Sequence, residues 1–271
     1  MSKRFQTIDV GGLKLFVAAI GGGPALMFLH GLGWDHHLWD EAFARYGDRY
    51  HVIAGDTRGH GQSEHPDRPY SIRQLAADWF TVLDHMQIDQ AILVGFSQGG
   101  MVAMEMALQQ PERFPALMLA CTTCCTPQAV SENLQQRLAT LAQMGALATA
   151  KLASQSIFSP PFIEQNPDYI TQFIEHRAAA NQTSLKFAMA AVMGFDVCGQ
   201  LGQLTQPGLV IAGEQDTLTP PATVAAIHQH YPHSRFVCVP NTGHLIPVEQ
   251  PEPFYRQIDA ALARLSASVA P

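Results

Sequence analysis

The sequence carries few charges, no long apolar run and no cluster of basic residues. Only 14% of its 271 residues are charged and 47% are apolar, which excludes a disordered chain and predicts a large buried core. Nowhere do about eighteen apolar residues follow one another, which argues against a membrane span. The net charge is −7, and no Lys/Arg cluster follows a phosphate backbone, which argues against a nucleic-acid partner.

Cysteine is also scarce. The five cysteines are an odd number without framework spacing, and no apolar run marks the first residues as a secretory signal. These features predict reduced thiols in a cytoplasmic protein. Cys121, Cys124 and Cys125 lie close together, but no second ligand pair with metal-type spacing is near them, so we expect no metal ion. His36 and His37 are interpreted as a solvated helix start rather than as a ligand pair.

Short apolar runs alternate with longer amphipathic segments, which is typical of βαβ units and a parallel sheet. Gly11-Gly12 is predicted to turn a hairpin, and Ser71 to cap a helix that continues to Met86. Buried strands are predicted at 25–29, 51–54, 91–94, 116–121, 209–212 and 235–239.

The alternation stops between residues 126 and 200. This stretch is rich in Ala, Leu, Met and Gln with helical spacing and shows no strand pattern. We therefore predict one core domain built from residues 1–125 and 201–271, with residues 126–200 inserted as a helical cap.

A nucleophile motif lies between a predicted buried strand and a helix. Gly95-Phe96-Ser97-Gln98-Gly99 has the G-x-S-x-G spacing, in which the serine occupies a turn so tight that glycines must flank it. The helix N-terminus directs backbone N–H groups toward the reaction centre. Ser97 is the predicted nucleophile.

A serine hydroxyl requires a base, and the base requires an orienting acid. His244 follows the last predicted strand in a loop, and Asp216 follows the strand at 209–212, which gives the order serine, acid, histidine. Ser97 and Asp216 would both lie at carboxyl ends of parallel strands. Glu214 is the nearest rival to Asp216 and ranks second because it lies so close to the strand end.

Two N–H groups must stabilise the oxyanion. We expect one from Gln98, directly after the nucleophile, and the other from Leu32 in the loop His30-Gly31-Leu32-Gly33. In each case the backbone would act, and the side chain would be incidental. His30 and Trp34 are expected mainly to brace this loop, although both could touch substrate.

These motifs together resemble the α/β-hydrolase superfamily, in particular its esterase and 3-oxoadipate enol-lactonase branch. The resemblance runs in order over nearly the whole core domain, through the segments His30-Gly31-x-Gly33, Asp56–Ser63, the Ser97 elbow, Gly213-x-x-Asp216 and Gly243-His244. It implies an α/β fold with a mostly parallel eight-stranded sheet flanked by helices, an inserted helical cap and no cofactor. In such relatives Asp56–Ser63 is a structural turn, a role we carry over.

The chain is less similar to cofactor-free haloperoxidases and carbon–carbon bond hydrolases. Many carbon–carbon hydrolases have a tryptophan directly after the catalytic histidine, where this chain has Leu245. Haloalkane dehalogenases need an aspartate at the elbow, so Ser97 excludes them.

The predicted cap supplies apolar side chains that could cover Ser97 and suit an acyl chain or aromatic ester. The expected substrate-binding residues are Trp34, Phe158, Phe162, Met189, Met193 and Leu245. A lactone with a free carboxylate would instead need a cation, preferably the planar fork of an arginine. The basic residues of the cap are Arg137, Lys151, Arg177 and Lys186, of which Arg177 and Lys186 could simply face water.

The sequence predicts a serine hydrolase that cleaves small to medium apolar carboxylic esters through an acyl-enzyme intermediate. An enol-lactone or carbon–carbon bond hydrolase with the same three residues is the alternative. A ligand receptor that retains them is a third hypothesis, which no residue favours. The expected partner is a small molecule rather than a nucleic acid or a membrane, and the expected state is a monomer or homodimer.

Overall fold

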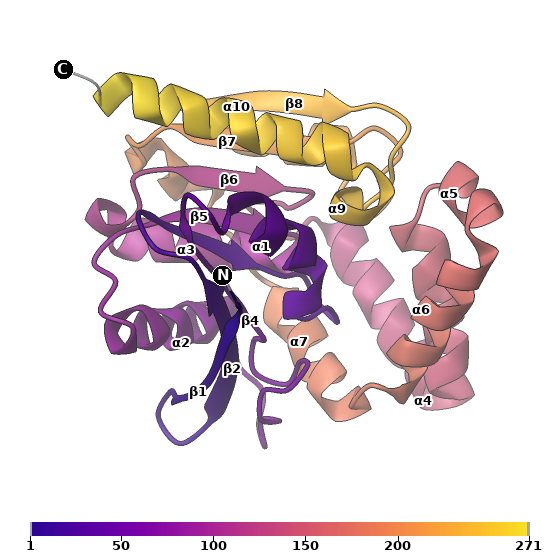
Figure 1. The fold of residues 1–271 in the computed structure, drawn as a ribbon. Helices are drawn as coiled ribbons and strands as arrows, with labels where there is room; N and C mark the ends of the chain where they lie inside the picture. Colours follow the sequence, from indigo (N-terminus) through magenta and orange to yellow (C-terminus); the bar gives the residue numbers. More distant parts are fainter. Residues whose placement is uncertain (1, 270–271) are drawn as a thin grey trace.

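The computed structural model describes residues 2–269, and its strands form one eight-stranded sheet in the order β1-β2-β4-β3-β5-β6-β7-β8 (Figure 1). The pairs β1–β2 and β2–β4 are antiparallel and the others are parallel, which confirms the predicted mostly parallel sheet. The strands are β1 (Arg4–Asp9), β2 (Lys14–Ile20), β3 (Ala25–Leu29), β4 (His51–Gly55), β5 (Ala91–Phe96), β6 (Leu117–Ala120), β7 (Gly208–Gly213) and β8 (Ser234–Val239).

The strands lie where the apolar runs predicted them. Every residue of β3, β5 and β6 is buried, as expected for central parallel strands covered on both faces. The edge strand β1 is mostly exposed. The hairpin prediction also holds, because Gly11 and Gly12 both have φ of +89° and the Val10 N–H donates to the carbonyl of Leu13 at 2.8 Å.

Helices cover both faces of the sheet. One apolar core joins the sheet to α2 (Ile72–His85), α3 (Gln98–Gln109) and α8 (Pro221–His230). A second core joins the other face to α1 (Asp40–Tyr46) and α10 (Pro251–Val269). The Ser71 hydroxyl accepts the Gln74 N–H, as predicted for the cap of α2. Shorter helices are η1 (His36–Trp39), η2 (Pro111–Arg113), η3 (Cys198–Gln203) and α9 (Ile246–Glu249).

Four α-helices, followed by the short helix η3, lie between β6 and β7 in the chain, and the four α-helices lie beside the sheet in Figure 1. We call them the α4–α7 segment: α4 (Gln128–Ile157), α5 (Pro160–Gln165), α6 (Pro167–Ala179) and α7 (Gln182–Val192). A break at Gly145, where φ is +81°, divides α4 into two parts. The group lies on the side toward which the arrows of β6 and β8 point, which is the carboxyl edge of the parallel strands (Figure 1). Within residues 2–269 no helix is both long and apolar enough to cross a membrane.

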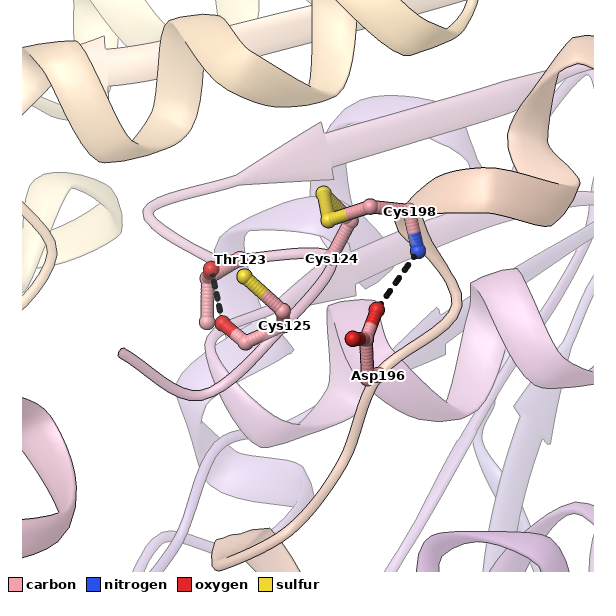
Figure 2. The surroundings of a disulfide bond; sticks show 5 residues. All are labelled: Thr123, Cys124, Cys125, Asp196 and Cys198. Carbon is pink, nitrogen blue, oxygen red and sulfur yellow. Dashed lines mark hydrogen bonds between the residues drawn. A yellow bond between two sulfur atoms is a disulfide. The ribbon is translucent and has the colours of Figure 1, made fainter. Parts of the chain in front are cut away.

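A disulfide bond joins Cys124 to Cys198 (Figure 2). Cys124 follows β6 and Cys198 begins η3, so the bond ties together the two ends of the α4–α7 segment. The prediction that all five cysteines are free thiols is therefore wrong for these two. The partners are 74 positions apart, and no local spacing could have paired them. Because its sulfur is in the disulfide, Cys124 is not a free thiol that could bind a metal ion together with Cys121 and Cys125.

Candidate functional site

Ser97 lies at the turn between β5 and α3, in the strained conformation that the motif predicts. Its φ is +52° and its ψ is −120°. A Cβ atom added to Gly95 would lie 2.5 Å from the Gly99 carbonyl oxygen, and one added to Gly99 would lie 2.2 Å from that of Leu29. The two glycines are thus required by the packing of this turn. The Thr122 hydroxyl donates to the Ser97 carbonyl at 2.7 Å and holds the turn from the loop that follows β6.

The structure brings Ser97, His244 and Asp216 together. His244 Nε2 lies 3.0 Å from Ser97 Oγ, and His244 Nδ1 lies 2.8 Å from Asp216 Oδ2. His244 and Asp216 are only 4% and 3% exposed, so water competes little for these hydrogen bonds. Because the Asp216 carboxylate accepts a hydrogen bond from Nδ1–H, the lone pair of Nε2 faces the serine hydroxyl. This arrangement can remove the hydroxyl proton as the oxygen attacks a carbon atom.

Hydrogen bonds from its own loop hold the Asp216 carboxylate. Asp216 Oδ1 accepts the N–H groups of Leu218 at 2.8 Å and Thr219 at 2.9 Å, and Oδ2 accepts the Thr219 hydroxyl at 2.6 Å. Sequence reasoning missed Thr219, although an Asp followed three residues later by Thr is a spacing at which the carboxylate can reach the backbone. Glu214, the rival acid, is exposed and binds the Asn241 N–H at 2.9 Å.

A free cysteine also reaches this group. The Cys121 sulfur follows β6 and lies within 4.8 Å of the nearest side-chain atoms of Asp216 and His244. Burial and the neighbouring Asp216 carboxylate raise the pKa of Cys121 well above its usual value, so the thiol stays neutral. A neutral, buried thiol fills the space beside Asp216 and does not take the Nδ1 proton of His244.

The loop that carries His244 is braced by Glu249. Glu249 Oε2 accepts the Gly243 N–H at 3.0 Å and the Ser159 N–H at 3.1 Å, so one buried carboxylate links this loop to the residue between α4 and α5. The His244 N–H itself donates to the Ile157 carbonyl at the end of α4, at 2.8 Å. The α4–α7 segment thus holds the histidine through its backbone.

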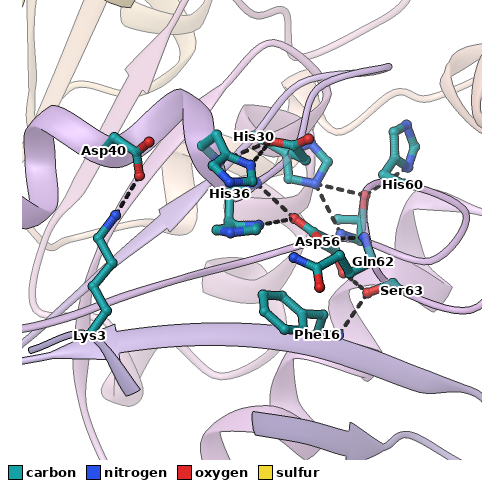
Figure 3. A network of polar contacts seen from close by, with 12 residues as sticks. Lys3, Phe16, His30, His36, Asp40, Asp56, His60, Gln62 and Ser63 are labelled. Atoms are coloured by element: carbon teal, nitrogen blue, oxygen red, sulfur yellow. Dashed lines mark hydrogen bonds and ion pairs between the residues drawn. The ribbon is translucent and has the colours of Figure 1, made fainter. Parts of the chain in front are cut away.

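The predicted oxyanion loop follows β3 and is held from inside the core by His30. The Thr57 N–H donates to His30 Nε2 at 3.0 Å, so the ring proton is on Nδ1, which donates to the Gly31 carbonyl at 2.8 Å (Figure 3). Burial lowers the pKa of His30, which keeps the ring in this neutral form. The same Gly31 carbonyl also accepts the Trp34 N–H at 3.1 Å. His30 therefore braces the loop, as expected, and fixes the peptide group whose N–H belongs to Leu32.

The turn at 56–63 is built around the buried Asp56 carboxylate (Figure 3). Asp56 accepts the backbone N–H groups of His36 and Gln62 and pairs with His36 Nδ1 at 2.8 Å. Burial alone would lower the pKa of His36, but the bond to Asp56 raises it. The prediction that the His36-His37 pair is solvated is wrong for His36, which is 2% exposed because it completes this network, whereas His37 is exposed.

A cavity of about 230 Å³ opens at Ser97 and His244. Leu32, Gln98 and Trp34 line it, so both predicted oxyanion residues and one predicted substrate residue border the same space as the nucleophile. The remaining walls are mostly apolar and come from α4 and from the loop after Asp216. They include Val130, Leu134, Leu218 and Pro220.

The other predicted substrate residues do not border this cavity. The Phe158 and Phe162 rings stack on each other with centroids 5.4 Å apart, so they pack α5 against the end of α4. Met189 borders a separate small space beside Arg137 and Arg177, and Met193 packs against the core. Leu245 is fully buried in the core below the site. Sequence alone cannot separate such packing residues from lining residues, because both are apolar.

Two arginines of the α4–α7 segment project into the cavity. Arg137 on α4 and Arg177 on α6 are each 8% exposed, whereas Lys151 and Lys186 are exposed. The suggestion that Arg177 faces water is therefore wrong. Within residues 2–269 neither guanidinium has a carboxylate partner, and Arg137 Nη2 has no hydrogen-bond partner at all.

The electrostatics of the pair follow from this isolation. Burial lowers the pKa of Arg137 to about 10. Burial, and then the like charge of Arg137, lowers the pKa of Arg177 to about 9. Two buried cations without an anion are costly in the empty protein, and a bound anion would remove the cost.

Comparisons with known proteins agree with the fold. The family model for the alpha/beta hydrolase fold matches residues 24–251. The chain is 35% identical over 243 residues to 3-oxoadipate enol-lactonase 2 of Acinetobacter baylyi, and the match covers 90% of each chain. Among solved structures, an enol-lactonase from Burkholderia xenovorans matches with a TM-score of 0.88 at 23% identity, covering 96% of this chain and 100% of the other. A thermophilic esterase from Thermogutta terrifontis matches with a TM-score of 0.87 at 24% identity, covering 97% and 99%.

Proposed function

We propose that this chain, which belongs to the α/β-hydrolase family and is a hydrolase, uses Ser97, His244 and Asp216 to cleave an ester or enol-lactone that carries a carboxylate. The α4–α7 segment would be the cap predicted from the sequence, here residues 126–200, and it would supply the carboxylate-binding residues. The first candidate substrate is 3-oxoadipate enol-lactone, because the relative that is 35% identical over 90% of the chain bears that name.

The reaction would proceed in two steps through an acyl-enzyme. Ser97 Oγ attacks the carbonyl carbon while His244 Nε2, 3.0 Å away, takes its proton. The N–H groups of Leu32 and Gln98 stabilise the oxyanion. The carbon–oxygen bond to the leaving enol or alcohol breaks as His244 returns the proton to that oxygen. His244 then takes a proton from water, whose oxygen attacks the acyl carbon. The bond between that carbon and Ser97 Oγ breaks as His244 returns the proton to Oγ, which frees the acid product. Asp216 keeps the imidazole oriented and stabilises its charged form throughout.

The observation that carries the choice of substrate is the pair of arginines. A neutral apolar ester would leave Arg137 and Arg177 buried beside it without a counter-ion, which costs several kcal/mol. A carboxylate would satisfy the unpaired Nη2 of Arg137 and reduce the repulsion between the two cations. The apolar walls suit the short carbon skeleton between that carboxylate and the scissile carbonyl. The proposed substrate therefore differs from the small apolar ester expected from the sequence in that it carries a carboxylate.

Matched substrates test this proposal. We expect mono-p-nitrophenyl adipate to be cleaved with a kcat/KM at least about tenfold above that of p-nitrophenyl hexanoate, which has the same chain length and no carboxylate. Ser97→Ala should abolish cleavage of both esters and of 3-oxoadipate enol-lactone while the melting temperature stays near that of the wild type. Equal rates for the two esters would refute the anionic substrate, and persistent turnover by Ser97→Ala would refute the nucleophile.

A further inference from the structure

The proposed cap contacts more than the substrate space, because it also binds the loops that form the reaction centre. Arg177 Nη1 on α6 donates to the Leu32 carbonyl at 3.1 Å. The Gln98 side-chain amide donates to the Ala188 carbonyl of α7 at 3.0 Å. Both residues proposed to form the oxyanion hole are therefore hydrogen-bonded to the cap. An element that only covered the substrate would need neither bond.

The geometry at Leu32 gives the first of these bonds a specific consequence. Leu32 lies between two peptide groups, and the orientation of its N–H depends on both. Its own N–H shares a peptide group with the Gly31 carbonyl, which His30 Nδ1 and the Trp34 N–H hold from the core side. The carbonyl of the next peptide group is held from the cap side by Arg177. Arg177 thus supplies the second of the two fixed points that orient Leu32.

The loop is shaped to receive this guanidinium. Gly33 has φ of +75°, and a Cβ atom there would lie 1.2 Å from Arg177 Nη1. The guanidinium therefore lies directly on the backbone of Gly33, in space that only glycine leaves open. The ring of Trp34 stacks on Phe173, one turn before Arg177 on the same helix, with centroids 5.4 Å apart. Two successive turns of α6 are docked on the oxyanion loop.

We infer that Arg177 is a positioning residue for the oxyanion hole, which it aligns from the cap through the Leu32 carbonyl. The inference rests on the proposed function, because it takes the Leu32 N–H as an oxyanion donor. Docking of the cap and formation of the oxyanion hole are then one event. The enzyme stabilises the transition state fully only when α6 lies on the loop. Arg177 therefore acts on every ester, neutral or anionic, in addition to its charge in the carboxylate site.

A neutral ester separates this role from anion binding. With p-nitrophenyl hexanoate, Arg177→Met should lower kcat about 10- to 100-fold, up to the loss caused by removing one oxyanion donor. KM should change less than about threefold, because the neutral ester has no group for the guanidinium. Arg177→Lys should recover a measurable part of kcat, since an ammonium can still donate to the Leu32 carbonyl. Lys186→Met removes an exposed cap charge on α7 and is the matched control, with kcat near that of the wild type.

A transition-state mimic gives a second test, because its inhibition constant would not change if Arg177 only stabilised the fold. The hydroxyl of Ser97 adds to the carbonyl of a neutral alkyl trifluoromethyl ketone, its proton passes to His244, and the ketone oxygen becomes an oxyanion. The inhibition constant of this ketone should rise in Arg177→Met by the same factor by which kcat/KM for the neutral ester falls. The circular dichroism spectrum should match that of the wild type, and the melting temperature should be no lower, because methionine removes a buried charge that has no counter-ion.

The outcomes are distinct from those of the substrate proposal. If kcat of Arg177→Met on the neutral ester stays within twofold of the wild type, or if the ketone binds unchanged, the positioning role is wrong. An equal loss in Arg177→Lys and Arg177→Met would also refute it. None of these results depends on whether the natural substrate is anionic, which the comparison of adipate and hexanoate esters decides separately.

Discussion

Replacing Arg137 by methionine should weaken catalysis and strengthen the fold at the same time. Methionine keeps an unbranched apolar stem against the cap and removes the charge. In the free protein that charge is 8% exposed and has an Nη2 atom without a partner. Its removal therefore relieves a cost in the empty enzyme and deletes a proposed partner of the substrate carboxylate.

Both effects have an expected size. Burial lowers the pKa of Arg137 from its ordinary value to about 10, a change equivalent to roughly 3 kcal/mol of penalty on the charged form. We expect Arg137→Met to raise the free energy of unfolding by about 1 to 3 kcal/mol in urea titrations. A hydrogen bond to a charged group contributes about 1.5 to 3 kcal/mol, so the ratio of kcat/KM for the adipate ester over the hexanoate ester should fall about 10- to 100-fold.

Lys186→Met serves as the control, because it removes an exposed charge from the same proposed cap. It should change neither the ratio of the two esters nor the stability by more than about 0.5 kcal/mol. Destabilisation of the protein by Arg137→Met, or an equal loss of kcat/KM for both esters, would be the opposite outcome. Either result would mean that Arg137 is a packing residue whose charge has no anionic partner.

Three further predictions concern other parts of the molecule. Asp216→Asn should lower kcat by about three to four orders of magnitude at unchanged melting temperature, because the amide no longer selects the Nδ1–H form of His244; a loss below tenfold in steady-state assays would contradict this role. Burial lowers the pKa of His60 to about 3, below the 6.5 of the unfolded chain. The contribution of His60 to the free energy of unfolding is therefore fully present above pH 6.5, and it decreases by about 1.4 kcal/mol per pH unit as the pH falls toward 3. In urea titrations between pH 7 and 5, the free energy of unfolding of His60→Asn should depend less on pH than that of the wild type, by up to this amount per unit. The same pH dependence in both proteins would refute the prediction. Opening the disulfide between Cys124 and Cys198, 74 positions apart, with dithiothreitol or by Cys198→Ser should lower the free energy of unfolding by up to about 4 kcal/mol. Cys238→Ser removes a free cysteine and should lower it hardly at all. Equal melting temperatures in all forms would show that the disulfide does not stabilise the two ends of the α4–α7 segment.

Local rules predicted much of this molecule. The elbow glycines and the hairpin at Gly11-Gly12 are short-range patterns that report on backbone geometry directly. The order of Ser97, Asp216 and His244 along the chain is a pattern of the family that the sequence resembles. The buried strands could be predicted because parallel strands are apolar on both faces. Glu214 ranked second to Asp216 because it lies so close to the end of its strand, and in the structure Glu214 accepts the Asn241 N–H at 2.9 Å instead.

The remaining features depend on contacts between distant segments. Helical spacing places Arg177 on α6 but does not say whether its face meets water or the loop at Leu32, 145 positions away. The partner of Cys124 and the buried state of His36 are set in the same way, by segments that only the fold brings close. Phe158 and Leu245 were expected at the substrate because apolar lining and apolar packing have the same composition. Location in the cytoplasm and the oligomeric state stay predictions.

Ser97 should form an acyl-enzyme with a carboxylate-bearing substrate. Rapid acid quenching of the enzyme during turnover of mono-p-nitrophenyl adipate, followed by mass spectrometry of the proteolysed protein, tests it directly. We expect an adipoyl group on the peptide that contains Ser97, none in Ser97→Ala, and a weaker signal from the hexanoate ester under equal conditions. Turnover without any adduct on this peptide, or an adduct on another residue, would contradict it.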